Sequence, residues 1–170
     1  MKFAWTADHL YVAADITDST PLVNPHEGTQ IWRGDGLELY LGFGGHSRDF
    51  GYTPRHYQIG ITPGDEGENP YVWNWRARDA EGRPVPDGAR VEGAEVAVQR
   101  FDSGYRLEAA IPLAAFGETI APRQVIGFDF AVNNQADPKA EKKEATMMWN
   151  GGPDNWRNPS GWGFAVLLPE

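Results

Sequence analysis

The spacing of apolar residues along the chain is the feature that most restricts its fold. Leu37, Leu39 and Leu41 alternate with Glu38 and Tyr40, a period of two residues instead of the 3.6 of a helix. The clearest segments with this alternation are 9–16, 36–43, 105–111 and 126–133. Such alternation is typical of antiparallel strands that bury one face and leave the other toward solvent.

Further strands are expected where the alternation is weaker, at 55–62, 70–78, 94–101, 145–149 and 162–168. The 20 glycines and 13 prolines gather between such segments, as in 63–67 and 84–88, and mark turns. Residues 113–116 predict a helical turn, and residues 137–144 a second one. The sequence therefore predicts one all-β domain over residues 1–170, an antiparallel β-sandwich of about 9–11 short strands.

Charge and composition exclude several classes of partner and site. The net charge of −9 repels phosphate backbones and anionic lipid, so neither nucleic acid nor a membrane surface is an expected partner. No stretch approaches the roughly 20 apolar residues of a membrane span. The chain has no cysteine, which excludes disulfides, thiol catalysis and zinc–thiolate sites.

Enzymatic motifs are missing as well. The sequence has no nucleophile elbow, no phosphate-binding glycine loop and no His-Glu-x-x-His, and its four histidines lack metal-ligand spacing. A glycosidase needs two carboxylates across the scissile bond, and Glu38, Glu108 and Asp129 lie in predicted strands. Solvated or hydrogen-bonded strand carboxylates are the simpler interpretation, and the chain is not expected to be an enzyme.

Seven tryptophans exceed what a core of this size needs, and two of them stand in unusual surroundings. Trp32 precedes a strand and Trp156 lies in a late loop, both among glycine and hydrogen-bonding residues. A pyranose has apolar C–H faces and a polar rim, so indole rings can stack on it while polar side chains bind its hydroxyls. These two residues predict a sugar site.

The other tryptophans have more ordinary interpretations. Trp5 and Trp162 are expected to pack in the sandwich, and Trp149 to support the loop that carries Trp156. Trp73 and Trp75 share one face of a predicted strand. They form either a second flat platform or a cross-strand packing pair, with packing the favoured alternative.

The order of motifs resembles the family 9 carbohydrate-binding modules. Trp32, Asp35, Leu37 and Glu38 match a Trp-x-x-Asp-x-(Val/Leu)-Glu pattern of that family. The segments that carry the resemblance, in family order, are 5–18, 31–40, 104–112, 126–134 and 148–163. Each motif is loose alone, but five in the right order cover nearly the whole chain.

The resemblance implies a β-sandwich of the DOMON-like type, an accessory module of xylanases and related enzymes. In the family two tryptophans clamp a terminal sugar, often the reducing end of cellulose or xylan, and Trp32 and Trp156 match them. The polar partners implied by the resemblance are Glu38, Gln58, Asn133 and Asn150. The family also binds structural calcium, for which Asp18 and Asp35 are the matching candidates, and oxygen ligands suit that ion.

Family members begin with a further strand before the segment that matches residues 2–5, so this strand is expected to be missing here. The resemblance also predicts an extracellular or periplasmic location, although residues 1–5 do not read as a signal peptide. Two alternatives remain. One is a haem-binding electron-transfer domain on the DOMON scaffold, with Met147 or Met148 and a histidine as axial ligands. The other is a structural sandwich of a larger hydrolase.

Overall fold

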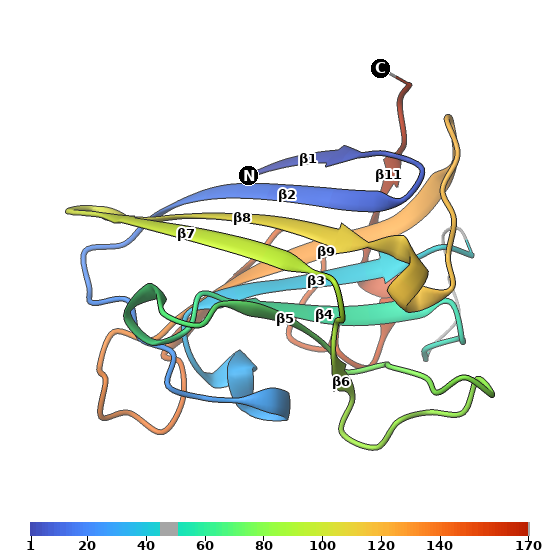
Figure 1. Ribbon diagram of the computed structural model, residues 1–170. Coiled ribbons are helices and arrows are strands. Elements are labelled where there is room, and N and C mark those ends of the chain that lie inside the picture. The colour runs from blue at the N-terminus through green and yellow to red at the C-terminus, as the bar shows by residue number, and fades with distance from the viewer. Residues whose placement is uncertain (45–50, 170) are drawn as a thin grey trace.

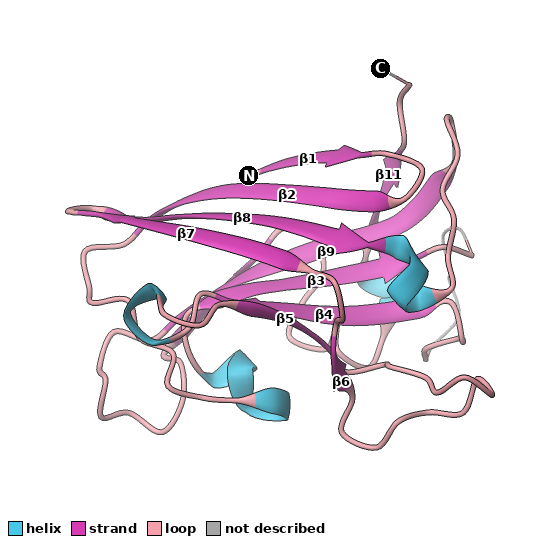
Figure 2. Cartoon of the chain, viewed as in Figure 1, coloured by secondary structure: helices cyan, strands magenta, loops and turns pink. Residues whose placement is uncertain are grey.

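Strands make up almost all regular structure of the chain. The computed structural model describes residues 1–44 and 51–169, and in these it contains eleven strands and four short 3-10 helices (Figure 2). The strands are β1 Lys2–Trp5, β2 His9–Thr17, β3 Gly36–Gly42, β4 His56–Thr62, β5 Tyr71–Asn74, β6 Ala89–Arg90, β7 Glu95–Phe101, β8 Gly104–Pro112, β9 Val125–Asn134, β10 Ala145–Met148 and β11 Gly163–Val166. The 3-10 helices are η1 Gly28–Arg33, η2 Asp65–Gly67, η3 Leu113–Phe116 and η4 Pro159–Gly161.

The strands form two antiparallel sheets packed face to face (Figure 1). Sheet A has the order β1-β2-β8-β7, and sheet B has the order β10-β9-β3-β4-β5-β6. Strand β11 pairs with the first residues of β9 and β10 with its last, so the two short strands share one edge of sheet B. This confirms the predicted antiparallel β-sandwich of 9–11 strands.

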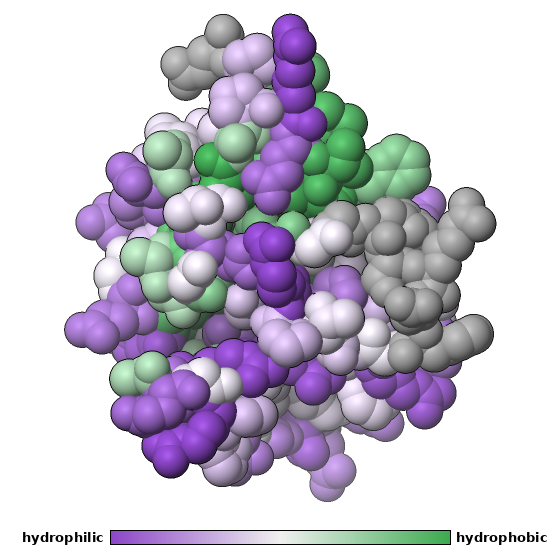
Figure 3. Space-filling model, turned by 90° about the vertical axis from the view of Figure 1, so that its right-hand side faces the viewer, coloured by the Kyte–Doolittle hydropathy of each residue, from purple (hydrophilic) through white to green (hydrophobic). Residues whose placement is uncertain are grey.

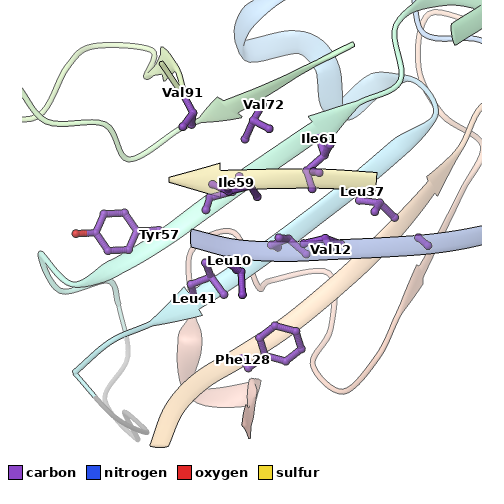
Figure 4. Packing of buried hydrophobic residues seen from close by; sticks show 14 of the residues in the cluster. Leu10, Val12, Leu37, Leu41, Tyr57, Ile59, Ile61, Val72, Val91 and Phe128 are labelled. Carbon is purple, nitrogen blue, oxygen red and sulfur yellow. The ribbon is translucent and has the colours of Figure 1, made fainter. Parts of the chain in front are cut away.

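The core lies between the sheets and follows from the period-two pattern. Leu37, Leu39 and Leu41 of β3 are almost completely buried and point toward sheet A, where Leu10 and Val12 of β2 meet them (Figure 4). The outward residues of β3 and β4 differ from the half-exposed strands that the alternation predicted. They are buried too, because loops cover the outer face of sheet B.

The predicted helical turn at 113–116 is present as η3, whereas the one at 137–144 is wrong. This segment forms turns, because side chains satisfy its backbone groups. The Gln135 amide donates to the Asp137 and Ala140 carbonyls, and the Glu144 carboxylate accepts from the N–H of Ala136. The helix η1 and the short β6 were not predicted.

One side of the sandwich exposes apolar residues. Figure 3 looks onto the side where β11 and the C-terminus lie in Figure 1, and apolar side chains gather in its upper half. Val125, Val166 and Leu168 are exposed near this edge of sheet B, and the indole N–H of Trp5 donates to the Leu168 carbonyl at 3.0 Å. No helix in the described part of the chain has the length and apolar character that a membrane crossing requires.

Candidate functional site

A cleft of about 920 Å³ lies on the outer face of sheet B. Its walls come from η1, from the loops on either side of β10 and from the loop after β5; η1, the 135–144 loop and the 75–88 loop lie below sheet B in Figure 1. The lining residues are Thr29, Gln30, Trp32, Glu38, Tyr40, Gln58, Trp75, Asp87, Lys143, Thr146, Met148, Gly151, Gly152, Pro153 and Trp156. Aromatic and polar groups therefore meet in one hollow.

Strand register sets the floor of the cleft. Glu38 on β3 stands opposite Ala131 of β9 and Gly60 of β4. Its neighbours across the strands are therefore small, and the carboxylate is the polar group at the centre of the floor. Side chains of a strand alternate between faces, so Tyr40 lies on the same outer face, opposite Gln58.

The Glu38 carboxylate is buried and fully hydrogen-bonded. One oxygen accepts from the Tyr40 hydroxyl at 2.8 Å and the Gln58 amide at 2.9 Å. The other accepts from the Asn133 amide at 2.8 Å and the Lys143 ammonium at 3.2 Å. Only 5% of its surface is exposed, and these partners offset the free energy that burying a carboxylate costs. Burial and the nearby Glu38 charge also raise the pKa of Tyr40, so its hydroxyl stays protonated.

Trp32 stands near the end of η1 with two cations beside its ring. The Lys143 ammonium and the Arg33 guanidinium each lie 5.5 Å from the ring centroid. Lys143 also donates to the Asn133 side-chain oxygen at 2.6 Å. Trp32 is therefore linked through Lys143 to the same polar cluster that surrounds Glu38.

Trp156 projects from the loop between β10 and β11 and is 51% exposed. Its carbonyl accepts from the Arg76 guanidinium at 2.9 Å, and the same guanidinium lies 4.2 Å from the ring centroid of Tyr52. The Tyr52 hydroxyl in turn donates to the Asn155 carbonyl at 2.8 Å. The backbone on which the exposed indole stands is thus held by two side chains from other parts of the chain.

Asp129 of β9 anchors the loop between β10 and β11 through hydrogen bonds. Its side chain is completely buried, and its oxygens accept from the N–H groups of Asn150 at 3.1 Å and Gly151 at 2.6 Å. The Asn155 amide donates to it at 2.9 Å. Trp162 packs beside this region on Tyr40, with ring centroids 5.6 Å apart, in a second apolar cluster on the outer face of sheet B.

The structure brings most of the predicted sugar-binding residues together. Trp32, Trp156, Glu38 and Gln58 line the cleft. Asn133 lies beside it and bonds Glu38. Asn150 does not line it: its side chain is exposed and donates to the Gly161 carbonyl at 2.9 Å.

Lys143 and Trp75 belong to the cleft and were missed as site residues. Lys143 lies in the segment that was read as helical. The signal for Trp75 is its place on one strand face with Trp73, which allows a flat binding platform. Cross-strand packing is the interpretation that the sequence favours for this pair instead. The structure gives the two different surroundings, because Trp75 lines the cleft, whereas Trp73 packs near Gly28 and donates to the Asp87 carbonyl at 3.2 Å.

Two further tryptophans lie away from the cleft. Trp5 is partly buried against the core, as expected. Trp149 is 52% exposed and stacks on Phe130, with ring centroids 5.9 Å apart and an interplanar angle of 8°. Its ring also meets Phe128, so it lies against the side chains of β9 and contributes no wall to the cleft.

The two predicted calcium ligands are engaged otherwise. Asp35 is buried and its two oxygens accept from the N–H groups of Val23 at 2.7 Å and Gln135 at 2.8 Å. Asp18 accepts from the backbone N–H and hydroxyl of Thr20. Within residues 1–44 and 51–169, no three acidic or histidine side chains gather as a metal site. Calcium binding by Asp18 and Asp35 stays a prediction.

Asp35 predicts a dependence of stability on pH. Burial raises its pKa to about 6, against the two backbone N–H groups that favour the carboxylate. The unfolded chain releases this proton near pH 3.9, so the folded chain binds more protons between about pH 4 and 6. Stability from this group is therefore gained as the pH falls. From pH 7 to 4, wild type should gain about 2 kcal/mol relative to Asp35→Asn in urea unfolding. A constant difference between the two proteins would contradict this.

The haem alternative needs a methionine and a histidine at one pocket, and the described lining of the cleft contains only the methionine. Met147 is exposed, whereas its neighbour Met148 lines the cleft. No histidine is among the cleft-lining residues that the structure describes. His56 packs against Trp162, with centroids 5.4 Å apart. His46 lies outside the described residues.

Comparison with solved structures identifies the same architecture. The fold superposes on a family 9 carbohydrate-binding module from Caldicellulosiruptor kristjanssonii in complex with cellotriose, with a TM-score of 0.71 and 21% identity over 99% of this chain and 73% of the other. A structure described as such a module from the same organism with glucose gives a TM-score of 0.68 and 22% identity over 99% and 75%. At these identities the likeness shows the fold.

Relatives by sequence are long polysaccharide-degrading enzymes. The chain is 27% identical over 169 residues to exoglucanase XynX of Acetivibrio thermocellus and, at the same level, to endo-1,4-beta-xylanase A of Thermoanaerobacterium saccharolyticum. Each match covers 98% of this chain but only 13% and 12% of the relatives, so the chain spans about an eighth of their length. The family model described as carbohydrate family 9 binding domain-like matches residues 1–169, and the chain belongs to that family.

Proposed function

We propose that the chain binds the terminal sugar of a plant-type polysaccharide or oligosaccharide between Trp32 and Trp156, without catalysing a reaction on it. The observation that carries the proposal is the cleft itself, whose lining brings these two indoles together with the buried, hydrogen-bonded Glu38. Indole faces suit the apolar faces of a pyranose, and the Glu38 cluster suits its hydroxyls. We propose further that the terminal sugar bound in this way is the one at the reducing end.

The binding energy that such a site needs is modest. An affinity between 1 mM and 1 µM corresponds to about 4–8 kcal/mol. Two stacked aromatic faces and a few hydrogen bonds to a preformed cluster can supply this amount. Tyr40, Gln58, Asn133 and Lys143 already hold Glu38 in one orientation, so little ordering free energy is spent when the sugar binds.

The arrangement of carboxylates supports binding without hydrolysis. Glycosidases set two carboxyl groups across the bond to be broken. Among the described residues that line the cleft, the carboxylates are Glu38 and Asp87. Glu38 accepts hydrogen bonds from four donors, and Asp87 lies in a loop beyond Trp75. Of the other candidates, Asp129 is buried under the loop and Glu108 lines a shallow hollow on sheet A.

The relatives support a place in a larger enzyme. Both are named for activity on glucan or xylan, and both are far longer than this chain. A binding module of this kind would hold the enzyme on its polymer. Because such polymers are outside the cell, we also place the chain in an extracellular or periplasmic setting.

Calorimetric titration of the chain with glucose, xylose, cellobiose and xylobiose tests the proposal. Millimolar to micromolar binding is expected, and Trp32→Ala or Trp156→Ala should each weaken it about 30-fold, since removing a central aromatic contact costs about 2 kcal/mol. Binding by the borohydride-reduced disaccharides should be weaker, because reduction opens the ring that the clamp would hold.

Trp149→Ala is the matched control. Trp149 and Trp156 are about equally exposed, but Trp149 lies outside the cleft. This variant should keep the wild-type affinity. Sugar binding that survives both clamp substitutions, or an equal loss in the control, would contradict the proposal.

A further inference from the structure

Building on the proposed sugar site, we infer that Trp75 forms a second subsite, the surface on which the next sugar of the chain rests. The cleft of about 920 Å³ is large for one pyranose ring. Trp75 lines it together with Thr29, Gln30 and Asp87. An aromatic ring that shares a cleft with hydroxyl, amide and carboxylate groups is the same combination that we propose to bind a sugar at the clamp.

The Trp75 ring can occupy its position because the residue beneath it, Gly60, has no side chain. Trp75 comes directly after β5. Its backbone N–H donates to the Gln58 carbonyl at 3.1 Å, which extends the pairing with β4. A Cβ on Gly60 would lie 2.5 Å from the Cη2 atom of Trp75. The indole therefore lies directly over Gly60. Because Gly60 pairs with Glu38, the ring begins one strand away from the carboxylate at the centre of the cleft.

The opposite end of the cleft is closed by Lys143. Its side chain is 16% exposed, bonds Glu38 and Asn133, and lies over Trp32. A sugar on Glu38 therefore cannot continue toward Lys143 without breaking this ion pair. The direction across β4 toward Trp75 remains, and a bound chain would enter with its terminal ring at Glu38 and its second ring over Trp75.

Trp75 also supports the helix η1 through a hydrogen bond, and this structural role has to be distinguished from a role as a second subsite. Its indole N–H donates to the Thr29 carbonyl at 3.1 Å, which ties it to the helix that carries Trp32. If support were its role, loss of the side chain would disturb Trp32 and weaken every sugar equally. A second subsite would instead affect sugars with two or more rings and leave a single ring unchanged.

The test compares glucose with cellobiose by calorimetric titration of the whole chain. Wild type should bind cellobiose about 10-fold more tightly than glucose, the gain from one more stacked ring. Trp75→Leu should remove this gain and change the glucose affinity less than about twofold. Trp75→Phe keeps an aromatic face and lacks the N–H, so it should retain most of the gain.

Trp149→Leu is the matched control, because Trp149 is an exposed indole that lies outside the cleft. It should bind both sugars as wild type does. Equal loss of glucose and cellobiose affinity in Trp75→Leu, or equal affinity of wild type for the two sugars, would overturn this inference alone. Absence of binding of either sugar to wild type would overturn the proposed function, and the subsite with it.

Discussion

Replacing Asp129 by alanine is expected to lower the free energy of unfolding by about 4 kcal/mol, because buried donors left without a partner cost about 1–3 kcal/mol each. Asp129 is completely buried and accepts from the Asn150 and Gly151 backbone N–H groups and from the Asn155 amide. None of these donors has an equivalent acceptor once the carboxylate is gone. Urea unfolding followed by tryptophan fluorescence measures the change.

The same substitution should weaken sugar binding in the molecules that remain folded. The loop held by Asp129 carries Trp156, and a mobile indole must be ordered before it can stack. Asp129→Asn keeps the size but turns one acceptor into a donor, so an intermediate loss is expected. Asp102→Ala, at an exposed turn, is the control and should change stability by less than about 0.5 kcal/mol. Equal stability of Asp129→Ala and this control would contradict the assigned role.

The sequence allowed the sandwich to be predicted because its strands carry local signals. The alternation at Leu37, Leu39 and Leu41 indicates which face of the strand is buried. Each segment with this alternation forms a strand in the structure. Trp32 and Trp156 were found by local composition as well. In both cases the neighbours along the chain, glycines and polar side chains, already indicate that the side chain is not in the core.

What could not be predicted depends on pairing between distant segments. The place of Trp75 is decided by Gly60 on the neighbouring strand, and nothing near Trp75 in the sequence shows that a glycine lies beneath its ring. Lys143 reaches Glu38 across 105 positions of sequence. The segment around it was read as helical, whereas Gln135 and Glu144 hold its backbone in turns.

Glu38→Ala is expected to reduce sugar affinity more than 100-fold, about 3 kcal/mol, since truncating one partner of a buried charged pair leaves the groups around it unpaired and no longer held in place for the hydroxyls of the sugar. Glu38 is the acceptor for Tyr40, Gln58, Asn133 and Lys143 together. Without it the ammonium, 16% exposed, loses the carboxylate with which it forms an ion pair. Titration with cellobiose measures the loss of affinity.

A second substitution separates the sugar-binding role of Glu38 from its part in stability. Adding Lys143→Met to Glu38→Ala removes the unpaired ammonium, and replacing both members of a buried pair by uncharged groups is often close to neutral for folding. The double variant should therefore regain much of the stability that Glu38→Ala loses, yet bind sugar as weakly. Recovery of both stability and affinity would show that Glu38 only balances Lys143 and that the hydroxyls of the sugar are recognised elsewhere in the cleft.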